Sequence, residues 1–106
     1  MASFLVQFSY TESGVKGLLK EGGSKRREVT EQLVKSLGGR LVAYYFTFGE
    51  YDGFAIIDGV ENVDAAAAGL TVAASGAVRT KTTVLLTPAE IDQATRKSPA
   101  YRPPGQ

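Results

Sequence analysis

The amino-acid sequence predicts an α+β fold whose elements follow one another as β-α-β-β-α-β, with a short helix after the last strand. Three observations predict it. Short apolar or alternating runs stand near residues 3–9, 40–48, 53–58 and 77–86, as in strands. Between them, apolar residues recur every three or four positions, as on one face of a helix. Glycine-containing turns separate these segments.

The first strand is expected at residues 3–9, where Phe4 and Phe8 point to one side. The stretch SYTE follows it and supplies the start of a helix. Ser9 or Thr11 can act as the cap, because a side-chain oxygen there accepts a hydrogen bond from a free N–H group of the first turn.

The first helix is expected over roughly residues 12–37. Gly22 and Gly23 interrupt its apolar stripe. Two adjacent glycines each destabilise a helix interior by about 1 kcal/mol relative to alanine, so we expect a kink or a short break there. Gly38 is expected to end the helix in a left-handed conformation.

The second strand is expected at residues 40–48 and the third at 53–58, joined as a hairpin by the turn GEYDG at 49–53. If its side chains alternate regularly, one side of the second strand carries Val42, Tyr44, Phe46 and Phe48. The other side carries Leu41, Ala43, Tyr45 and Thr47.

A second helix is expected at about residues 63–75, capped by Asn62, and the fourth strand at 77–86. Thr87 and Pro88 then open a short last helix. This order of elements is the split-βαβ, ferredoxin-like arrangement, with an antiparallel sheet of spatial order 4-1-3-2 and both long helices on one face. We expect one domain at residues 1–95 and an extended, proline-rich tail at 96–106.

Composition excludes several classes of function. Twelve basic and eleven acidic residues leave a net charge of +1, so neither nucleic acid nor a membrane is expected as a partner. The chain has neither cysteine nor histidine, so we expect no metal and no cofactor. The basic run Lys25-Arg26-Arg27 is interpreted as a solvated helix face. The N-terminus does not resemble a signal peptide, and a cytoplasmic location is expected.

The strands are too apolar for a monomer. Helices cover one face of the predicted sheet, yet both sides of the second and third strands carry large apolar residues. Burying the second face requires another copy, so we expect a homo-oligomer, dimer or higher. The candidate interface residues are Tyr44, Phe46, Phe48 and Tyr101.

The sequence resembles the GYD domain family. The turn Gly49-Glu50-Tyr51-Asp52 matches its Gly-x-Tyr-Asp signature, and the segment 76–82, GAVRTKT, matches its G-x-V-R-T-x-T strand. The resemblance covers about residues 4–93. It implies a ferredoxin-like fold of the dimeric α/β-barrel type, and it implies no activity, because the role of the family is uncharacterised.

A candidate ligand site follows from the topology. The end of the first strand, the hairpin and the start of the fourth strand are expected to meet, which gathers Tyr10, Tyr51, Asp52 and Arg79. Asp52 can pair with Arg79 or with the hairpin's own amides, Tyr51 can cover a pocket, and Arg79 can hold a ligand carboxylate. A purely structural role of the same residues stays open, because aspartate commonly satisfies amides in turns and arginine commonly guards edge strands.

Three hypotheses of function remain. The first is a non-catalytic oligomeric module that binds a small molecule or a partner. In the second, a cofactor-independent enzyme acts on a small apolar or aromatic compound, with Tyr51 or Tyr10 as acid, Asp52 as base and Arg79 stabilising an anion. Its pocket would lie between helices and sheet, lined by Tyr44 and Tyr45, or between subunits. The third is a structural assembly subunit whose tail reaches a neighbour.

Overall fold

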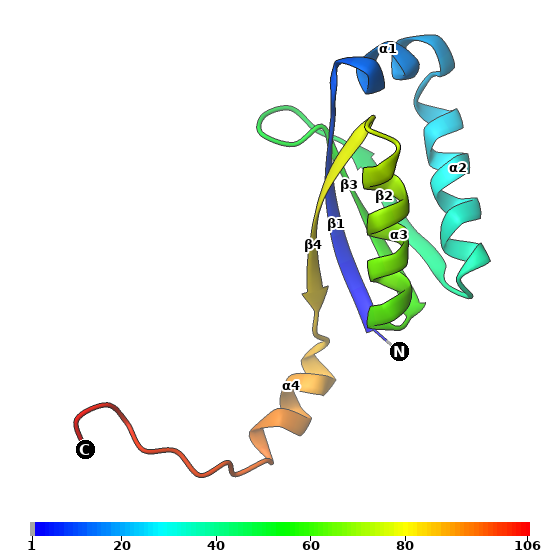
Figure 1. Cartoon of the computed structure of the whole chain (residues 1–106). Helices are drawn as coiled ribbons and strands as arrows, with labels where there is room; N and C mark the ends of the chain where they lie inside the picture. The colour runs from blue at the N-terminus through cyan, green and yellow to red at the C-terminus, as the bar shows by residue number, and fades with distance from the viewer. Residues whose placement is uncertain (1) are drawn as a thin grey trace.

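A computed structural model describes residues 2–106 of the chain (Figure 1). The elements are β1 (Ala2–Tyr10), α1 (Glu12–Glu21), α2 (Gly23–Ser36), β2 (Arg40–Phe46), β3 (Gly53–Val60), α3 (Asn62–Ala74), β4 (Val78–Leu85) and α4 (Pro88–Thr95). The predicted order of elements is confirmed.

The four strands form one antiparallel sheet in the order β2-β3-β1-β4, which is the predicted order read from the opposite edge. Helices α2 and α3 lie on the same face of this sheet (Figure 1). The fold is therefore ferredoxin-like, as the sequence predicts. The buried core lies between this face and the helices, where Phe4, Val34, Leu41, Ala55, Ile57 and Val60 form one cluster and Phe8 is also buried.

The long first helix is broken at Gly22, as expected. Gly22 has a φ of 88° and ψ of 166°, which places it between α1 and α2 in a backbone region that only glycine adopts readily. Of the two candidate caps, Thr11 is the one that caps α1, because its hydroxyl accepts a hydrogen bond from the Gly14 N–H at 3.3 Å. Gly38, with a φ of 81°, follows α2 in the left-handed conformation.

The expected alternation along β2 is wrong at Val42. Leu41 pairs with Ile57, but Ala43 pairs with Ile56, so the register shifts between them and Val42 bulges out of the ladder. The bulge brings Leu41 onto the same face as Tyr44 and leaves Tyr45 on the opposite one. Strand β2 also ends at Phe46, two residues earlier than expected, which leaves a loop at 47–52 before β3.

Helix α3 begins one residue earlier than its predicted cap implies. Asn62 is the first helical residue, and Glu61 is the cap. The Asp64 carboxylate accepts a hydrogen bond from the Glu61 N–H at 3.1 Å, as in a capping box. Glu61 and Asp64 therefore cap the start of α3, the role that was expected of Asn62.

Helix α4 and the tail stand away from the rest of the molecule (Figure 1). The radius of gyration is 17.0 Å, whereas a compact domain of this size has about 13 Å. Helix α4 is well capped, because the Thr87 hydroxyl and the Glu90 carboxylate each accept a backbone hydrogen bond at the helix start. Within residues 2–106, no helix is both long enough and apolar enough to cross a membrane.

Candidate functional site

Asp52 ties the β2–β3 loop to the end of β1. Its carboxylate accepts a hydrogen bond from the Tyr10 N–H at 2.8 Å, and its own N–H donates to the Phe8 carbonyl oxygen at 2.8 Å. The base of the loop is closed by Thr47, whose N–H donates to the Asp52 carbonyl oxygen and whose hydroxyl donates to the Tyr51 carbonyl oxygen, each at 2.8 Å. The loop is thus fixed to the sheet by backbone and side chain together.

Gly53 is required by the same arrangement. A Cβ atom at this position would lie 2.4 Å from the Phe8 ring and 2.5 Å from the Tyr45 carbonyl oxygen. Because both distances are far below van der Waals contact, the aromatic ring of Phe8 sits where a side chain of residue 53 would be. The second glycine of GEYDG therefore makes room for a core ring.

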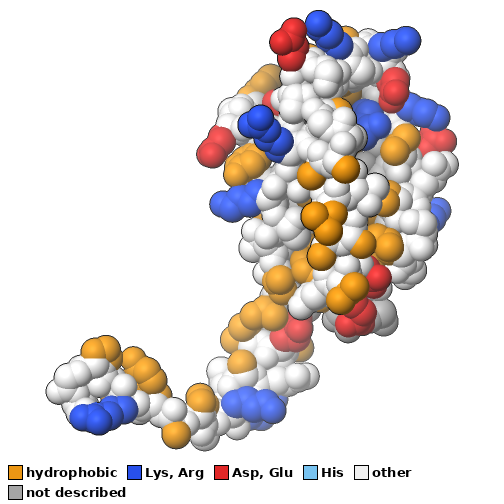
Figure 2. Space-filling model, viewed as in Figure 1, with side chains coloured by type: hydrophobic (Ala, Val, Ile, Leu, Met, Phe, Trp, Pro, Cys, Tyr) orange, Lys and Arg blue, Asp and Glu red, His pale blue; other side chains and the backbone are white. Residues whose placement is uncertain are grey.

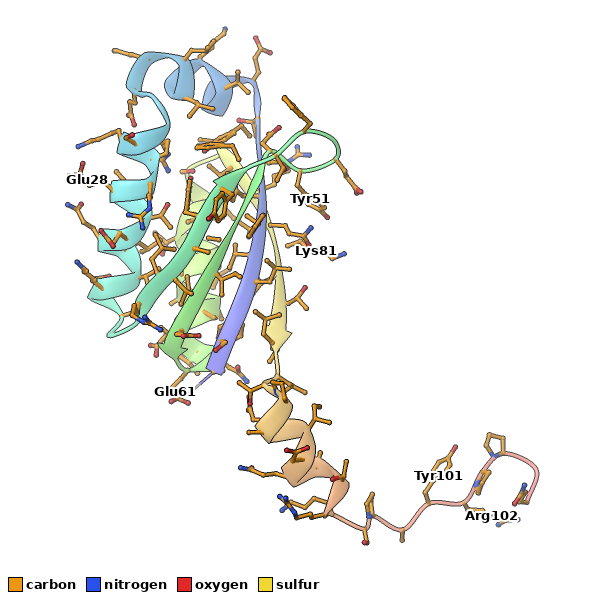
Figure 3. All side chains as sticks on the ribbon, turned by 180° about the vertical axis from the view of Figure 1, so that it is seen from behind. Glu28, Tyr51, Glu61, Lys81, Tyr101 and Arg102 are labelled. Carbon is orange, nitrogen blue, oxygen red and sulfur yellow. The ribbon has the colours of Figure 1, made fainter. Side chains whose placement is uncertain are left out.

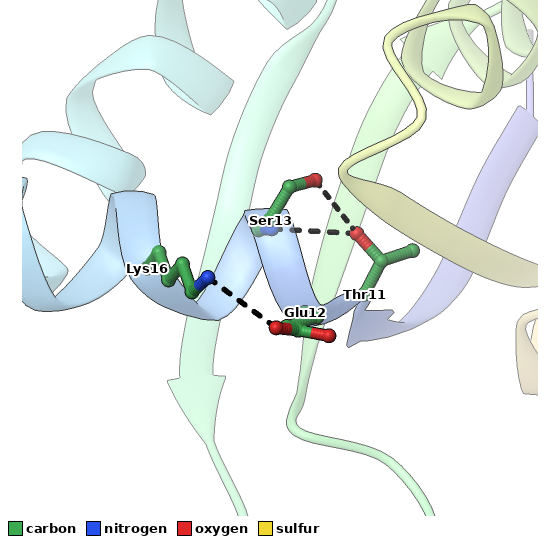
Figure 4. A network of polar contacts seen from close by, with 5 residues as sticks. Thr11, Glu12, Ser13 and Lys16 are labelled. Atoms are coloured by element: carbon green, nitrogen blue, oxygen red, sulfur yellow. Dashed lines mark hydrogen bonds and ion pairs between the residues drawn. The ribbon is translucent and has the colours of Figure 1, made fainter.

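The end of β1 also meets the start of β4. The Thr11 N–H donates to the Ala77 carbonyl oxygen at 3.0 Å, and its hydroxyl donates to the Gly76 carbonyl oxygen at 2.8 Å. Figure 4 shows Thr11 at the start of α1 beside Ser13, whose hydroxyl lies 3.1 Å from that of Thr11. A Cβ at Gly14 would lie 2.0 Å from the Ala77 oxygen, so this close approach needs glycine.

The Arg79 side chain does not pair with the Asp52 carboxylate. Arg79 is exposed opposite Ser9 on the edge strand β4, and among the described residues it forms no ion pair with Asp52, so the suggested Asp52–Arg79 pair is not formed. The Asp52 carboxylate instead accepts a hydrogen bond from the backbone N–H of Tyr10, which belongs to β1 and not to the hairpin whose amides were the other expected partners. Figure 3 shows Tyr51 on the loop and Lys81 on β4, toward the same end of the sheet.

A cavity of about 150 Å³ lies between the sheet and helices α2 and α3. It is partly open to solvent, and most of its wall is apolar. Helix α2 contributes Arg26, Val29, Thr30 and Leu33 to it, and α3 contributes Ala65, Ala68, Gly69 and Val72. Of the four predicted ligand residues, Tyr10 lines this cavity, while Tyr51, Asp52 and Arg79 are not among its walls.

Aromatic rings pack against one another where Phe8, Tyr10 and Tyr44 line the cavity. Phe8 stacks on Tyr44 with the ring centroids 5.2 Å apart, and it meets Tyr10 and Phe46 edge to face at 5.7 and 6.0 Å. Two of the four candidate interface residues, Tyr44 and Phe46, therefore lie on the helix-covered face. Phe48 is fully exposed in the loop and Tyr101 is exposed in the tail. A role of these four residues in an interface stays a prediction.

The Tyr44 hydroxyl is the perturbed group of this cavity. Burial raises the pKa of Tyr44 well above its usual value, and the neighbouring Tyr10 hydroxyl raises it further. The Thr30 hydroxyl and the positive charge of Arg26 act in the opposite direction. Tyr44 is therefore protonated at neutral pH and can donate a hydrogen bond.

Arg26 and Thr30 line the cavity, although neither was expected in a site from the sequence. Arg26 belongs to the basic run interpreted as a solvated face, yet its side chain is only 28% exposed, and its guanidinium lies 3.9 Å from the Glu21 carboxylate. One signal was present in the sequence: Arg26, Val29, Thr30 and Leu33 share one face of α2 at helical spacing. Within residues 2–106, no group of three or more acidic side chains is arranged to hold a metal ion.

Comparison with known proteins places the chain in a family. A protein of Thermus thermophilus, the "Glutamine synthetase and cystathionine beta-lyase binding protein", is 32% identical over 82 residues, which cover 77% of this chain and 85% of that protein. No solved structure matches the chain with significance. The sequence profile of the GYD domain matches residues 4–95, and the chain therefore belongs to the GYD domain family.

Proposed function

We propose that this protein is a non-catalytic binding protein whose partner is an enzyme. The observation that carries the proposal is its 32% identity with a relative that is named for binding two enzymes, glutamine synthetase and cystathionine β-lyase. Among the described residues, the cavity walls hold no carboxylate or lysine that could act as a general base, and the chain contains neither histidine nor cysteine, which favours a non-catalytic role.

The contact with the enzyme is proposed to lie on the C-terminal arm, which we define as residues 87–106. An eight-residue helix is marginal in water on its own, and α4 stands clear of the body of the domain (Figure 1). The arm nevertheless carries large apolar side chains in the open, with Ile91 46% and Tyr101 75% exposed. Both Tyr101 and Arg102 project from the extended tail (Figure 3). A protein partner would bury these side chains and order the arm.

The proposal is tested by mixing the protein with purified glutamine synthetase or cystathionine β-lyase from the organism that makes it. Sedimentation velocity then measures whether a complex forms. The unaltered chain is expected to bind at least one of the two enzymes. Ile91→Asp and Tyr101→Asp should each weaken binding at least about tenfold, as expected for a central apolar contact. Leu19→Asp is the matched control, because Leu19 is 81% exposed on α1, and it should bind as the unaltered chain does.

Two results would contradict these proposals separately. If the unaltered chain bound neither enzyme, the function proposed here would be wrong. If Leu19→Asp weakened binding while Ile91→Asp and Tyr101→Asp did not, enzyme binding would stand and its assignment to the arm would be wrong.

We also propose that two copies associate through the face of the sheet that the helices leave open. The register places Leu5, Ala43 and Ile56 side by side on this face, with Tyr45 and Phe54 in the next row, which continues through Gln7 to Lys81 at the β4 edge. Tyr45 is 62% exposed although its ring packs on Phe54 at a centroid distance of 5.7 Å. An apolar surface of this kind on a small domain favours burial against a second copy.

A further inference from the structure

The cavity between α2, α3 and the sheet has room for a molecule that the protein itself does not fill. Gly69 is in the middle of α3 and lines the cavity, yet a Cβ atom added there would meet no atom within 4 Å beyond the adjoining backbone of its own helix. The neighbouring wall residues of α3 are also small, Ala65 and Ala68. Figure 2 shows apolar side chains gathered over α3 and beside it. The small residues of α3 thus leave space against the sheet.

The volume of this space limits its occupant. An apolar cavity of about 150 Å³ accommodates one benzene-sized molecule. A nucleotide or a peptide is too large for it. Its walls suit a ring or a branched hydrocarbon, because Val6, Phe8 and Val78 of the sheet and Val72 of α3 supply apolar surface.

One end of the cavity is polar and positively charged. Arg26, Thr30, Tyr10 and Tyr44 lie there. The Thr30 hydroxyl donates to the Arg26 carbonyl oxygen at 2.9 Å, which fixes it on the helix. Arg26 has one acidic neighbour, Glu21, at 3.9 Å, and this separation leaves its other N–H groups able to bind a second anion.

We propose that the cavity binds a small organic acid of about benzoate size, with its ring or branched chain against the apolar walls and its carboxylate held by the Arg26 guanidinium and the Tyr44 hydroxyl, beside Thr30. Charge complementarity selects the carboxylate, because Arg26 is the one charged residue among the cavity walls that the described residues form. The site shares no residue with the C-terminal arm, so it can be tested independently of the proposed function.

Titration of the full chain with benzoate, followed by the amide resonances in a ¹⁵N–¹H NMR spectrum, tests the proposal. We expect saturable shifts at Thr30 and Gly69 with a dissociation constant on the order of 1 mM or tighter. Gly69→Leu fills the cavity and should abolish these shifts while the protein stays folded, because leucine also favours the helix. Gly17→Leu is the matched control, since Gly17 is likewise helical with open space around its Cβ, and it should bind benzoate normally.

Recognition of the carboxylate is tested with benzyl alcohol, a neutral molecule of similar shape. Benzoate should bind about tenfold more tightly than benzyl alcohol to the unaltered chain, and Arg26→Gln should remove that preference. If Arg26→Gln does not fold, the comparison of the two probes on the unaltered chain still decides the point.

Three results would overturn the proposal. The first is the absence of saturable binding of benzoate, cyclohexanecarboxylate and 3-methylbutanoate to the unaltered chain. The second is normal benzoate binding by Gly69→Leu, which would place the ligand elsewhere. The third is equal affinity for benzoate and benzyl alcohol, which would show that Arg26 does not select a carboxylate.

Discussion

At the scale of single residues, Asp52 has a defined structural role. Its carboxylate and its N–H group bind the backbone of β1 at Tyr10 and Phe8, 42 and 44 positions away in the sequence. A hydrogen bond with one charged partner contributes about 1.5–3 kcal/mol to stability when it is buried, and this one is partly buried. The aspartate of the GEYDG turn therefore fastens the loop whether or not it also meets a ligand.

Replacement of Asp52 by alanine is accordingly expected to lower the free energy of unfolding by about 1–2 kcal/mol, because the Tyr10 N–H loses its acceptor. Urea denaturation followed by circular dichroism measures the change. Glu50→Ala is the matched control, since Glu50 is an exposed acid in the same loop, and it should alter stability by less than about 0.5 kcal/mol. Equal effects of the two substitutions would show that the Asp52 bond contributes nothing specific.

At the scale of elements, the break between α1 and α2 depends on the backbone of Gly22. Its φ of 88° and ψ of 166° are accessible to glycine and strained for alanine, although a Cβ would meet no other atom within 4 Å. Gly22→Ala should therefore lower the free energy of unfolding by about 1–3 kcal/mol. Gly17→Ala, in the regular part of α1, should raise it by up to about 1 kcal/mol. Thermal unfolding distinguishes the two signs, and stabilisation by both would contradict a strained Gly22.

The same elements show which features a sequence can reveal. The Gly22 break and the caps Thr11 and Thr87 were predictable because their causes lie within a few neighbouring residues. The bulge at Val42 was not, because it exists only in the pairing of β2 with β3, and regular alternation alone gives no sign of it.

The candidate site divides in the same way. The sequence predicts that the loop, the end of β1 and the start of β4 lie close together. In the structure they do, because Asp52 binds the end of β1 and Thr11 binds the segment before β4. The Asp52 carboxylate binds the Tyr10 amide and not Arg79 or the hairpin's own amides, and the sequence could not reveal this partner because it depends on side-chain directions across the sheet. Arg26 was missed for a related reason: its burial follows from the packing of α2 beside Tyr44.

At the scale of the whole molecule, one layer of helices covers one side of the sheet and leaves the other side without a cover. Tyr45 lies on this open face, and Val63 is exposed at 78% on α3, on the helix side. The two residues therefore separate self-association through the sheet from self-association through the helices.

If two copies pack through the open face, a charge at Tyr45 must be buried without a partner, which disfavours the dimer strongly. Sedimentation equilibrium should show a dimer for the unaltered chain at micromolar concentration and a monomer for Tyr45→Lys. Val63→Lys introduces the same charge on the helix side and should leave the dimer intact. An unaltered chain that sediments as a monomer would contradict the association itself, whereas a monomeric Val63→Lys with a dimeric Tyr45→Lys would move the interface to the helices.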